Sequence, residues 1–293
     1  MYDIQGYIEA ESVSDAVALL ASNPRLKIIA GGTDVLIKLR HGQMEGAELL
    51  SIRKIKELER IEQLADGTIV IGALATFAQI FHEPIIHNNI PALAEAAVSM
   101  GGPQIRNVAT IGGNICNGAT SADSASTLFA LDARLRLRSS AGERVVPVQE
   151  FYLGPGKVDL KPDEMLSEFL ISPAGFRGFG GHYIKFAMRK AMDIATLGVS
   201  VMCKISGDVF REVKIGLGVA GPTPLRCVEA EEFAKGKAIY AETLAGIGRL
   251  AVKSTNARTS WRASREYREH LVEELTQRAL HVAIVRAGGA EIG

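Results

Sequence analysis

Cysteine is scarce in this sequence, and its spacing rules out several kinds of site. Only three of the 293 residues are cysteine, Cys116, Cys203 and Cys227, and no two of them form a CxxC pair. Their positions exclude a disulfide framework, a zinc ribbon and an iron–sulfur cluster held only by cysteines of this chain. The six histidines show neither HxH nor HExxH spacing, so we expect no metal site on this chain.

Excess charge and long apolar runs are also lacking. Lys+Arg and Asp+Glu both number 33, so the formal net charge is zero and gives no long-range attraction for nucleic acid. No run approaches the roughly 18 consecutive apolar residues of a membrane helix. The first residues, with Glu9 and Glu11 close to Met1, contain no basic or apolar signal segment. We therefore expect a cytoplasmic protein with no nucleic-acid or membrane partner.

The common phosphate-binding and hydrolase motifs are missing as well. The sequence contains neither GxxxxGK[ST] nor GxSxG. Residues 216–221 match GxGxxG formally, but Pro222 and Pro224 follow where a dinucleotide-binding helix would have to begin. We interpret this run as the glycine-rich end of a strand and reject a Rossmann site there.

The chain has the composition of an ordinary globular protein, with 47% hydrophobic and 23% charged residues. Its length suggests about two domains, and the glycine-rich stretch 174–181 predicts the boundary between them. Apolar residues at helical spacing predict a helix over 12–22, followed by a strand at 26–30 and a helix from Val35. The other expected elements are a hairpin of strands 58–64 and 68–74, helices starting at 76, after 91 and over 124–131, strands at 134–138, 182–187, 196–205 and 209–219, and helices at 226–235, 240–255 and 263–287.

Two double-glycine segments about eighty residues apart are the strongest chemical signal. The first is Gly31-Gly32, followed by Thr33 and Asp34, and the second is Gly112-Gly113, which lies between Thr110 and Asn114. Glycine lets backbone N–H groups approach an anion closely, and threonine and asparagine add side-chain donors. Each segment alone is typical of a turn. If the two converge, they predict a cradle for the pyrophosphate of a dinucleotide-like cofactor.

The segments AGGTDVLIKLR and GGPQIRNVATIGGNICNGATSADSASTLFALDA resemble the two FAD-binding signatures of the molybdenum hydroxylase flavoproteins. The resemblance continues through GPGKVDLKPDEML, HYIKFAMRKAMDIAT and SWRASREYREHL, so it covers nearly the whole chain. The run NGATSADSA resembles the xanthine dehydrogenase branch of the family.

This resemblance implies an α+β fold. A two-part FAD-binding domain of the vanillyl-alcohol-oxidase (PCMH) type is expected over residues 1–175, with its two parts divided near 55. A small C-terminal domain with a three-stranded antiparallel sheet and a helix bundle is expected over residues 176–293.

The resemblance also implies cofactor-binding residues. The first glycine segment should wrap the pyrophosphate and adjoining ribose with Ile28, Ile29, Ala30, Gly31, Gly32, Thr33, Asp34 and Val35. The second segment should contribute Thr110, Gly112, Gly113 and Asn114, and Asp123 should bind the sugar–phosphate region.

Four further residues match family positions along the cofactor. Met100, which stands where animal relatives have an aromatic residue, and Gly101 match positions beside it. Leu166 matches a residue of the adenine pocket, and Lys185 matches a lysine near the flavin ring. No catalytic acid, base or nucleophile is expected, because FAD would carry the chemistry.

The implied function is that of an electron-transfer subunit. A molybdenum-cofactor chain and a chain with two [2Fe-2S] clusters would be its partners, and NAD or another carrier would accept the electrons. The expected enzyme is xanthine dehydrogenase. Its substrate would be hydroxylated on the molybdenum chain, and this chain alone would not act on that substrate. The alternatives are the flavin subunit of a nicotinate, aldehyde or carbon monoxide dehydrogenase, and a flavin-free assembly scaffold.

Overall fold

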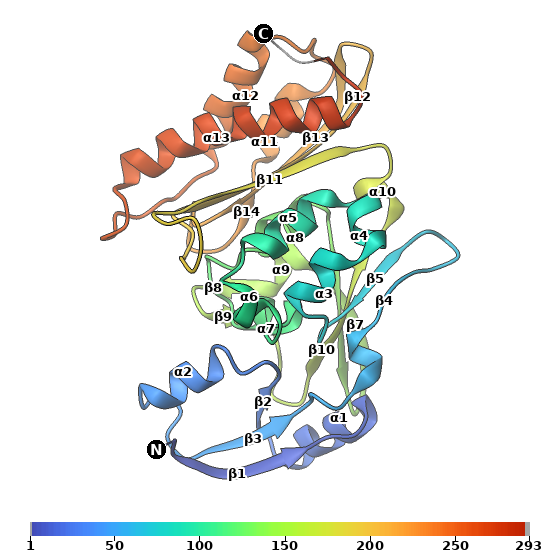
Figure 1. Cartoon of the computed structure of the whole chain (residues 1–293), viewed down its shortest axis with the longest axis vertical. Helices are drawn as coiled ribbons and strands as arrows, with labels where there is room; N and C mark the ends of the chain where they lie inside the picture. Colours follow the sequence, from blue (N-terminus) through green and yellow to red (C-terminus); the bar gives the residue numbers. More distant parts are fainter. Residues whose placement is uncertain (1, 291–293) are drawn as a thin grey trace.

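The computed structural model describes residues 2–290, which form three sheet-containing regions stacked along the longest axis of the molecule (Figure 1). The N-terminal region lies at one end, the C-terminal region at the other, and a helix-rich region lies between them. The mixed α+β architecture expected from the sequence is confirmed.

The N-terminal region is a three-stranded parallel sheet whose strands are connected through two helices. Its order is β1-β3-β2, so the last strand of the region lies in the middle. The helix predicted over 12–22 is confirmed: Ser12 caps it by accepting from the backbone N–H of Asp15, and its apolar stripe is buried. The elements are β1 (Ile4–Glu9), α1 (Val13–Ser22), β2 (Lys27–Ile29), α2 (Val35–Arg40) and β3 (Ala47–Ser51).

The middle region contains a five-stranded antiparallel sheet in the order β4-β5-β10-β6-β7. The predicted hairpin forms around Gly67, although its first strand is shorter than expected because residues 56–59 form a 3-10 turn. The alternating segment 134–138 is a strand as predicted, with Leu135 and Leu137 buried. The elements are η1 (Lys56–Glu59), β4 (Ile61–Gln63), β5 (Ile69–Gly72), β6 (Arg134–Ser139), β7 (Gly142–Pro147) and β10 (Met165–Ile171).

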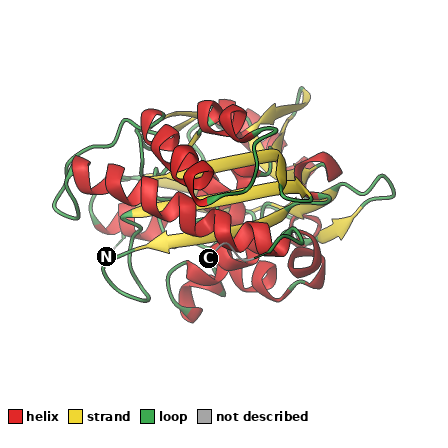
Figure 2. Ribbon diagram, turned by 90° about the horizontal axis from the view of Figure 1, so that it is seen from above, coloured by secondary structure: helices red, strands yellow, loops and turns green. Residues whose placement is uncertain are grey.

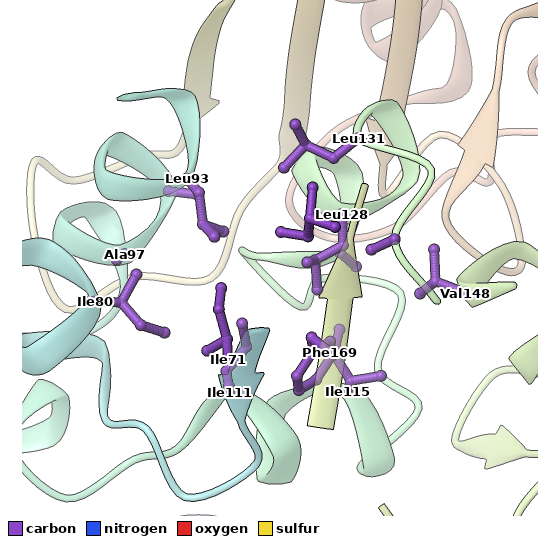
Figure 3. Packing of buried hydrophobic residues seen from close by; sticks show 14 of the residues in the cluster. Ile71, Ile80, Leu93, Ala97, Ile111, Ile115, Leu128, Leu131, Val148 and Phe169 are labelled. Atoms are coloured by element: carbon purple, nitrogen blue, oxygen red, sulfur yellow. The ribbon is translucent and has the colours of Figure 1, made fainter. Parts of the chain in front are cut away.

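Short helices pack on this sheet and enclose the largest apolar core, part of which is visible in Figure 3. No helix was expected in the glycine- and asparagine-rich residues 101–118, yet they contain two, α6 and α7. Pro103 begins the first helix and Thr110 caps the second by accepting from the N–H of Gly113, so these start signals outweigh the glycine content. The elements are α3 (Phe77–His82), α4 (Pro84–Asn89), α5 (Pro91–Ser99), α6 (Pro103–Arg106), α7 (Ile111–Cys116), α8 (Ala125–Ala130), α9 (Val148–Phe151), β8 (Tyr152–Gly154) and β9 (Lys157–Val158).

The C-terminal region is an antiparallel sheet with helices packed against it, and the long helix α13 lies along two of its strands (Figures 1 and 2). The three predicted strands are present, but a fourth strand of two residues, β14, extends the expected three-stranded sheet by pairing with Gly216 and Leu217. The three predicted helices are confirmed. The elements are α10 (Pro173–Phe176), β11 (Gly180–Phe186), β12 (Leu197–Ser206), β13 (Val209–Gly218), β14 (Leu225–Arg226), α11 (Val228–Ala234), α12 (Ala241–Lys253) and α13 (Arg265–Arg286).

The rejected GxGxxG run has a packing role. Gly216 and Gly218 lie in β13, and a Cβ atom added at Gly216 would lie only 1.9 Å from the carbonyl oxygen of Ser126 in α8. Glycine is therefore required at position 216 because the strand and the helix backbone touch. The interpretation as a strand end is confirmed.

A charged cluster reinforces the same junction. Arg226 donates two hydrogen bonds to the carboxylate of Glu231, at 2.7 and 2.8 Å, and also binds Asp132 and the carbonyl oxygen of Phe129 at the end of α8. The carboxylate of Glu231 accepts in addition from the N–H of Ile215. These bonds tie β13, β14 and α11 to the middle region.

Replacing Arg226 with alanine should lower the free energy of unfolding by about 3–5 kcal/mol, because the nearly buried carboxylate of Glu231 loses its partner. The matched control is Arg278→Ala on the exposed face of α13, which should change it by less than about 1 kcal/mol. Urea denaturation of both variants measures the difference, and equal midpoints would contradict the role given to Arg226.

Candidate functional site

The two glycine segments predicted to converge are in direct contact. A Cβ atom at Gly31 would lie 1.8 Å from the carbonyl oxygen of Val108 and 3.1 Å from the Cα atom of Ala109. Only a residue without a side chain permits this approach. The turn between β2 and α2 therefore lies against the backbone that leads into Thr110 and α7.

The first segment consists of a strand end, a turn and a helix start. Ile28 and Ile29 end β2, residues 30–34 form the turn, and Val35 begins α2. Gly32 has a φ of +76°, a backbone conformation that other residues rarely adopt. Beyond the turn, Lys38 donates a 2.7 Å hydrogen bond to the side chain of Asn117, which follows α7. The two segments are therefore joined at the glycine contact and again beyond it.

The second segment is the N-terminal turn of α7. Thr110 is buried and caps the helix, and Gly112 packs against Ala73, whose carbonyl oxygen would lie 2.6 Å from an added Cβ atom. Gly113 differs from Gly112: it is exposed, and an added Cβ atom would meet only the hydroxyl of Thr110 at 3.1 Å. One glycine thus serves internal packing, whereas the other leaves an open backbone surface.

Hydrogen bonds connect α7 to the start of α8. The side-chain oxygen of Asn114 accepts from the hydroxyl of Ser124 at 2.7 Å, and Asp123 is the preceding residue. Leu166, expected in an adenine pocket, lies buried in β10 against Leu137, and α7 packs on this strand. Asn114, Asp123 and Leu166 therefore all lie around α7.

Asp123, Lys185 and Met100 come together although they are far apart in the sequence. The ammonium group of Lys185 donates to a carboxylate oxygen of Asp123 and to the carbonyl oxygen of Ser99, both at 3.1 Å. Both side chains of the ion pair are only 9% exposed, so Lys185 is not a surface lysine. Met100, itself buried, and Gly101 follow Ser99 directly at the end of α5.

Tyr183 is a member of this cluster that the sequence reasoning missed. Its buried hydroxyl donates to the second carboxylate oxygen of Asp123 at 3.5 Å. Tyr183 precedes Lys185 by two residues in β11, and alternate residues of a strand share one face. That alternation was available in the sequence once Lys185 had been singled out.

Electrostatics at the cluster are governed by burial. Burial raises the pKa of Asp123 to about 6, and the charge of Lys185 opposes this shift. Burial, together with the nearby carboxylate of Asp123, also raises the pKa of Tyr183 well above its ordinary value. Tyr183 is therefore a neutral donor, and Asp123 is a carboxylate that can gain a proton under mildly acidic conditions.

Among residues 2–290, no group of three or more histidine, cysteine or acidic side chains is placed to hold a metal ion. Within the same residues, every helix is too short or too polar to cross a bilayer.

Two family models together match most of the chain. Residues 2–173 match the FAD-binding domain found in molybdopterin dehydrogenases, and residues 182–283 match the C-terminal domain of carbon monoxide dehydrogenase flavoproteins.

Curated relatives are similar over their full length. The xanthine dehydrogenase FAD-binding subunit of Escherichia coli O157:H7 is 44% identical over 289 residues, which is 99% of each chain. The carbon monoxide dehydrogenase medium chain of Hydrogenophaga pseudoflava is 33% identical over 283 residues, which is 96% of this chain and 97% of the relative.

Two solved structures have the same fold as this chain over nearly its whole length. Carbon monoxide dehydrogenase from Hydrogenophaga pseudoflava contains a chain that superposes with a TM-score of 0.92 at 30% identity, over 98% of this chain and 99% of that one. Quinoline 2-oxidoreductase from Pseudomonas putida 86 gives a TM-score of 0.90 at 26% identity, over 98% of each chain.

The titration of Asp123 provides a test of the cluster. Its carboxyl group should titrate with a midpoint near pH 6, and Lys185→Met should move the midpoint higher, because the positive charge that favours the carboxylate is removed. Carbon-13 NMR of labelled aspartate measures the midpoint, and Asp123→Asn identifies the signal. A midpoint that does not move in Lys185→Met would contradict the ion pair.

The raised pKa of Asp123 also determines how the free energy of unfolding changes with pH. The folded-state pKa of Asp123 lies above the ordinary aspartate value of 3.8. The contribution of Asp123 to the free energy of unfolding should therefore fall as the pH rises from about 4 to about 6, and stay constant above that. Below about pH 4 this contribution stays at its full value and no longer changes with pH, because the carboxyl group is then protonated in both the folded and the unfolded state.

Proposed function

The chain belongs to the family of FAD-binding flavoproteins of the molybdopterin dehydrogenases, and on that premise we propose that it binds FAD where its two glycine segments meet and serves as an electron-transfer subunit. The observation that carries the proposal is the contact between Gly31 and the backbone of Val108, with the exposed Gly113 close by. In such a site the turn at 30–34 would supply backbone N–H donors to a pyrophosphate without any lysine. The start of α7, where the N–H of Gly113 already donates to Thr110, would supply an open backbone surface beside it.

The residues of the site fit such a cofactor. The turn at 30–34 and the start of α7 would hold the pyrophosphate and ribose, and Asp123 would bind the sugar–phosphate region. Leu166 would line the adenine pocket from β10. Lys185, held in place by Asp123 and the carbonyl oxygen of Ser99, would lie near the flavin ring beside Met100 and Gly101.

FAD, when bound, would supply the exchange between single electrons arriving from iron–sulfur clusters and the electron pair that an acceptor such as NAD takes as hydride. The protein's part is to position the cofactor and to keep water away from it. Asp123 and Lys185 carry opposite charges. Because they form a buried ion pair, both charged groups lie near the site without either being left unpartnered.

We further propose that the complex is of the xanthine dehydrogenase type and is cytoplasmic. The chain would then act in purine oxidation together with an iron–sulfur subunit and a molybdenum-cofactor subunit. Support comes from the higher identity to the xanthine dehydrogenase subunit, 44%, than to the carbon monoxide and nicotinate dehydrogenase chains, 33% and 35%. The stretch 174–181 would separate the cofactor-binding part from the C-terminal part.

The first test is an absorption spectrum of the purified chain, with the flavin identified after acid release. We expect the two visible bands of a flavin, FAD as the released compound, and no broad iron–sulfur absorption. A protein that stays colourless after incubation with FAD would favour the scaffold alternative over the proposed function.

The second test replaces Gly113 with valine. The added side chain should occupy the open surface where the phosphates would lie, so FAD should no longer remain bound through gel filtration. The fold should persist, because no neighbour other than the hydroxyl of Thr110 lies within 4 Å of the added Cβ atom.

Circular dichroism checks the fold of Gly113→Val, and Gly113→Ala is the graded control, with a smaller loss of FAD. Stoichiometric FAD in the valine variant would show that the second glycine segment does not contact the cofactor.

A further inference from the structure

Two segments of the C-terminal region expose large apolar side chains next to each other. The loop between β11 and β12 contributes three, and the segment before α13 together with the first turn of that helix contributes two, including the only tryptophan of the chain. Trp261 is 75% exposed, more than any other large apolar residue among those described. We call this surface the Trp261 face; it consists of Met188, Met192, Ile194, Trp261 and Tyr267 with the charged residues between them.

The two segments are held side by side by buried contacts. Arg268 is 2% exposed and donates to the carbonyl oxygen of Thr196, just after the loop, and to the hydroxyl of Ser260 at 2.9 Å. The ring of Tyr267 lies edge-on to that of Phe186, with centroids 6.1 Å apart. The Trp261 face is therefore built on a fixed base and is not the chance exposure of a free loop.

The face is also basic in a chain whose net charge is zero. Residues 187–194 and 258–267 together contain five basic and two acidic side chains. Arg262 stacks over the ring of Trp261 at 4.2 Å, and Arg189 pairs with Asp193 within the loop. Tryptophan, tyrosine, methionine and arginine are the residue types enriched in the cores of protein interfaces.

One edge of the Trp261 face adjoins the proposed cofactor site. The backbone N–H of Met192 donates to the carbonyl oxygen of Gly101 at 3.2 Å. The sulfur of Met192 lies against Gly102, where an added Cβ atom would be 2.7 Å away. A partner on this face would therefore sit beside the residues expected along the flavin.

From these observations we propose that the Trp261 face is the docking surface for the iron–sulfur subunit, which would present a complementary acidic surface with an apolar centre. This proposal rests on the proposed function. The chain that delivers electrons must come close to the flavin, whereas the molybdenum chain need not. A permanent partner also explains an exposed apolar cluster better than a small acceptor would, since such clusters on soluble chains mark protein-binding sites.

The test uses the three chains produced together, with an affinity tag on this chain. Dissociation of the iron–sulfur subunit on dilution is followed by mass photometry. Trp261→Ala should raise its dissociation constant by about 30-fold or more, the effect of removing a central aromatic anchor. Tyr240→Ala is the matched control, because Tyr240 is 62% exposed in the same region but outside the Trp261 face, and it should leave the constant unchanged.

A second variant tests the charge of the face. Lys190 is exposed in the loop, and Lys190→Glu should weaken binding most at low salt, because added salt screens the attraction it removes. Equal dissociation constants for Trp261→Ala and Tyr240→Ala would overturn the proposal, as would loss of the molybdenum chain while the iron–sulfur subunit stays bound.

The FAD content of each preparation distinguishes a failure of the docking surface from a failure of the proposed function. If the wild-type complex holds FAD and Trp261→Ala retains both FAD and full affinity, only the docking surface is wrong. If the wild-type complex holds no FAD, the proposed function fails and the docking surface fails with it.

Discussion

The contact between Gly31 and the carbonyl oxygen of Val108 is the constraint on which the proposed site depends. Without a side chain at position 31, the turn after β2 can lie directly on the backbone that leads to α7. The turn at 30–34 and the backbone before α7, the two segments expected to hold a pyrophosphate, take their relative position from this contact. The hydrogen bond between Lys38 and Asn117 then holds the same two segments together from outside.

A second constraint links this cradle to the C-terminal region. Lys185 belongs to β11, yet its ammonium group is bound by Asp123 of the middle region and by the end of α5. Burial penalises both charges, so the pair persists only because each satisfies the other. The far end of the proposed site is thus closed by a residue of a different region, and under the proposed function the position of β11 would determine where the flavin ring lies.

Much of this arrangement could be predicted from the sequence, for reasons visible in single residues. The apolar stripe of α1, the alternation of Leu135 and Leu137, and the prolines after Gly221 were all local signals that the structure confirms. The fourth strand β14 and the helices of 101–118 were missed. β14 has only two residues, and it is a strand only because it pairs with β13. Glycine disfavours a helix, so α7 forms because Thr110 caps its first turn.

The contacts that matter most at the site could not be read from the sequence at all. Spacing alone does not show that Lys185 meets Asp123, or that Gly112 faces Ala73 while Gly113 faces outward. Such facts depend on how segments that are 62 residues apart in the first case and 39 in the second are brought together, which only the folded chain determines.

The glycine at position 216 has a consequence for exchanging parts between related proteins. The two family models that match this chain meet between residues 173 and 182, which suggests a natural joint for chimeras. However, β13 and α8 touch backbone to backbone across that joint, with no space for even a methyl group. A C-terminal half taken from a relative would pack on this chain only if it kept glycine at position 216 and an arginine at position 226. The two halves therefore cannot be exchanged freely between relatives.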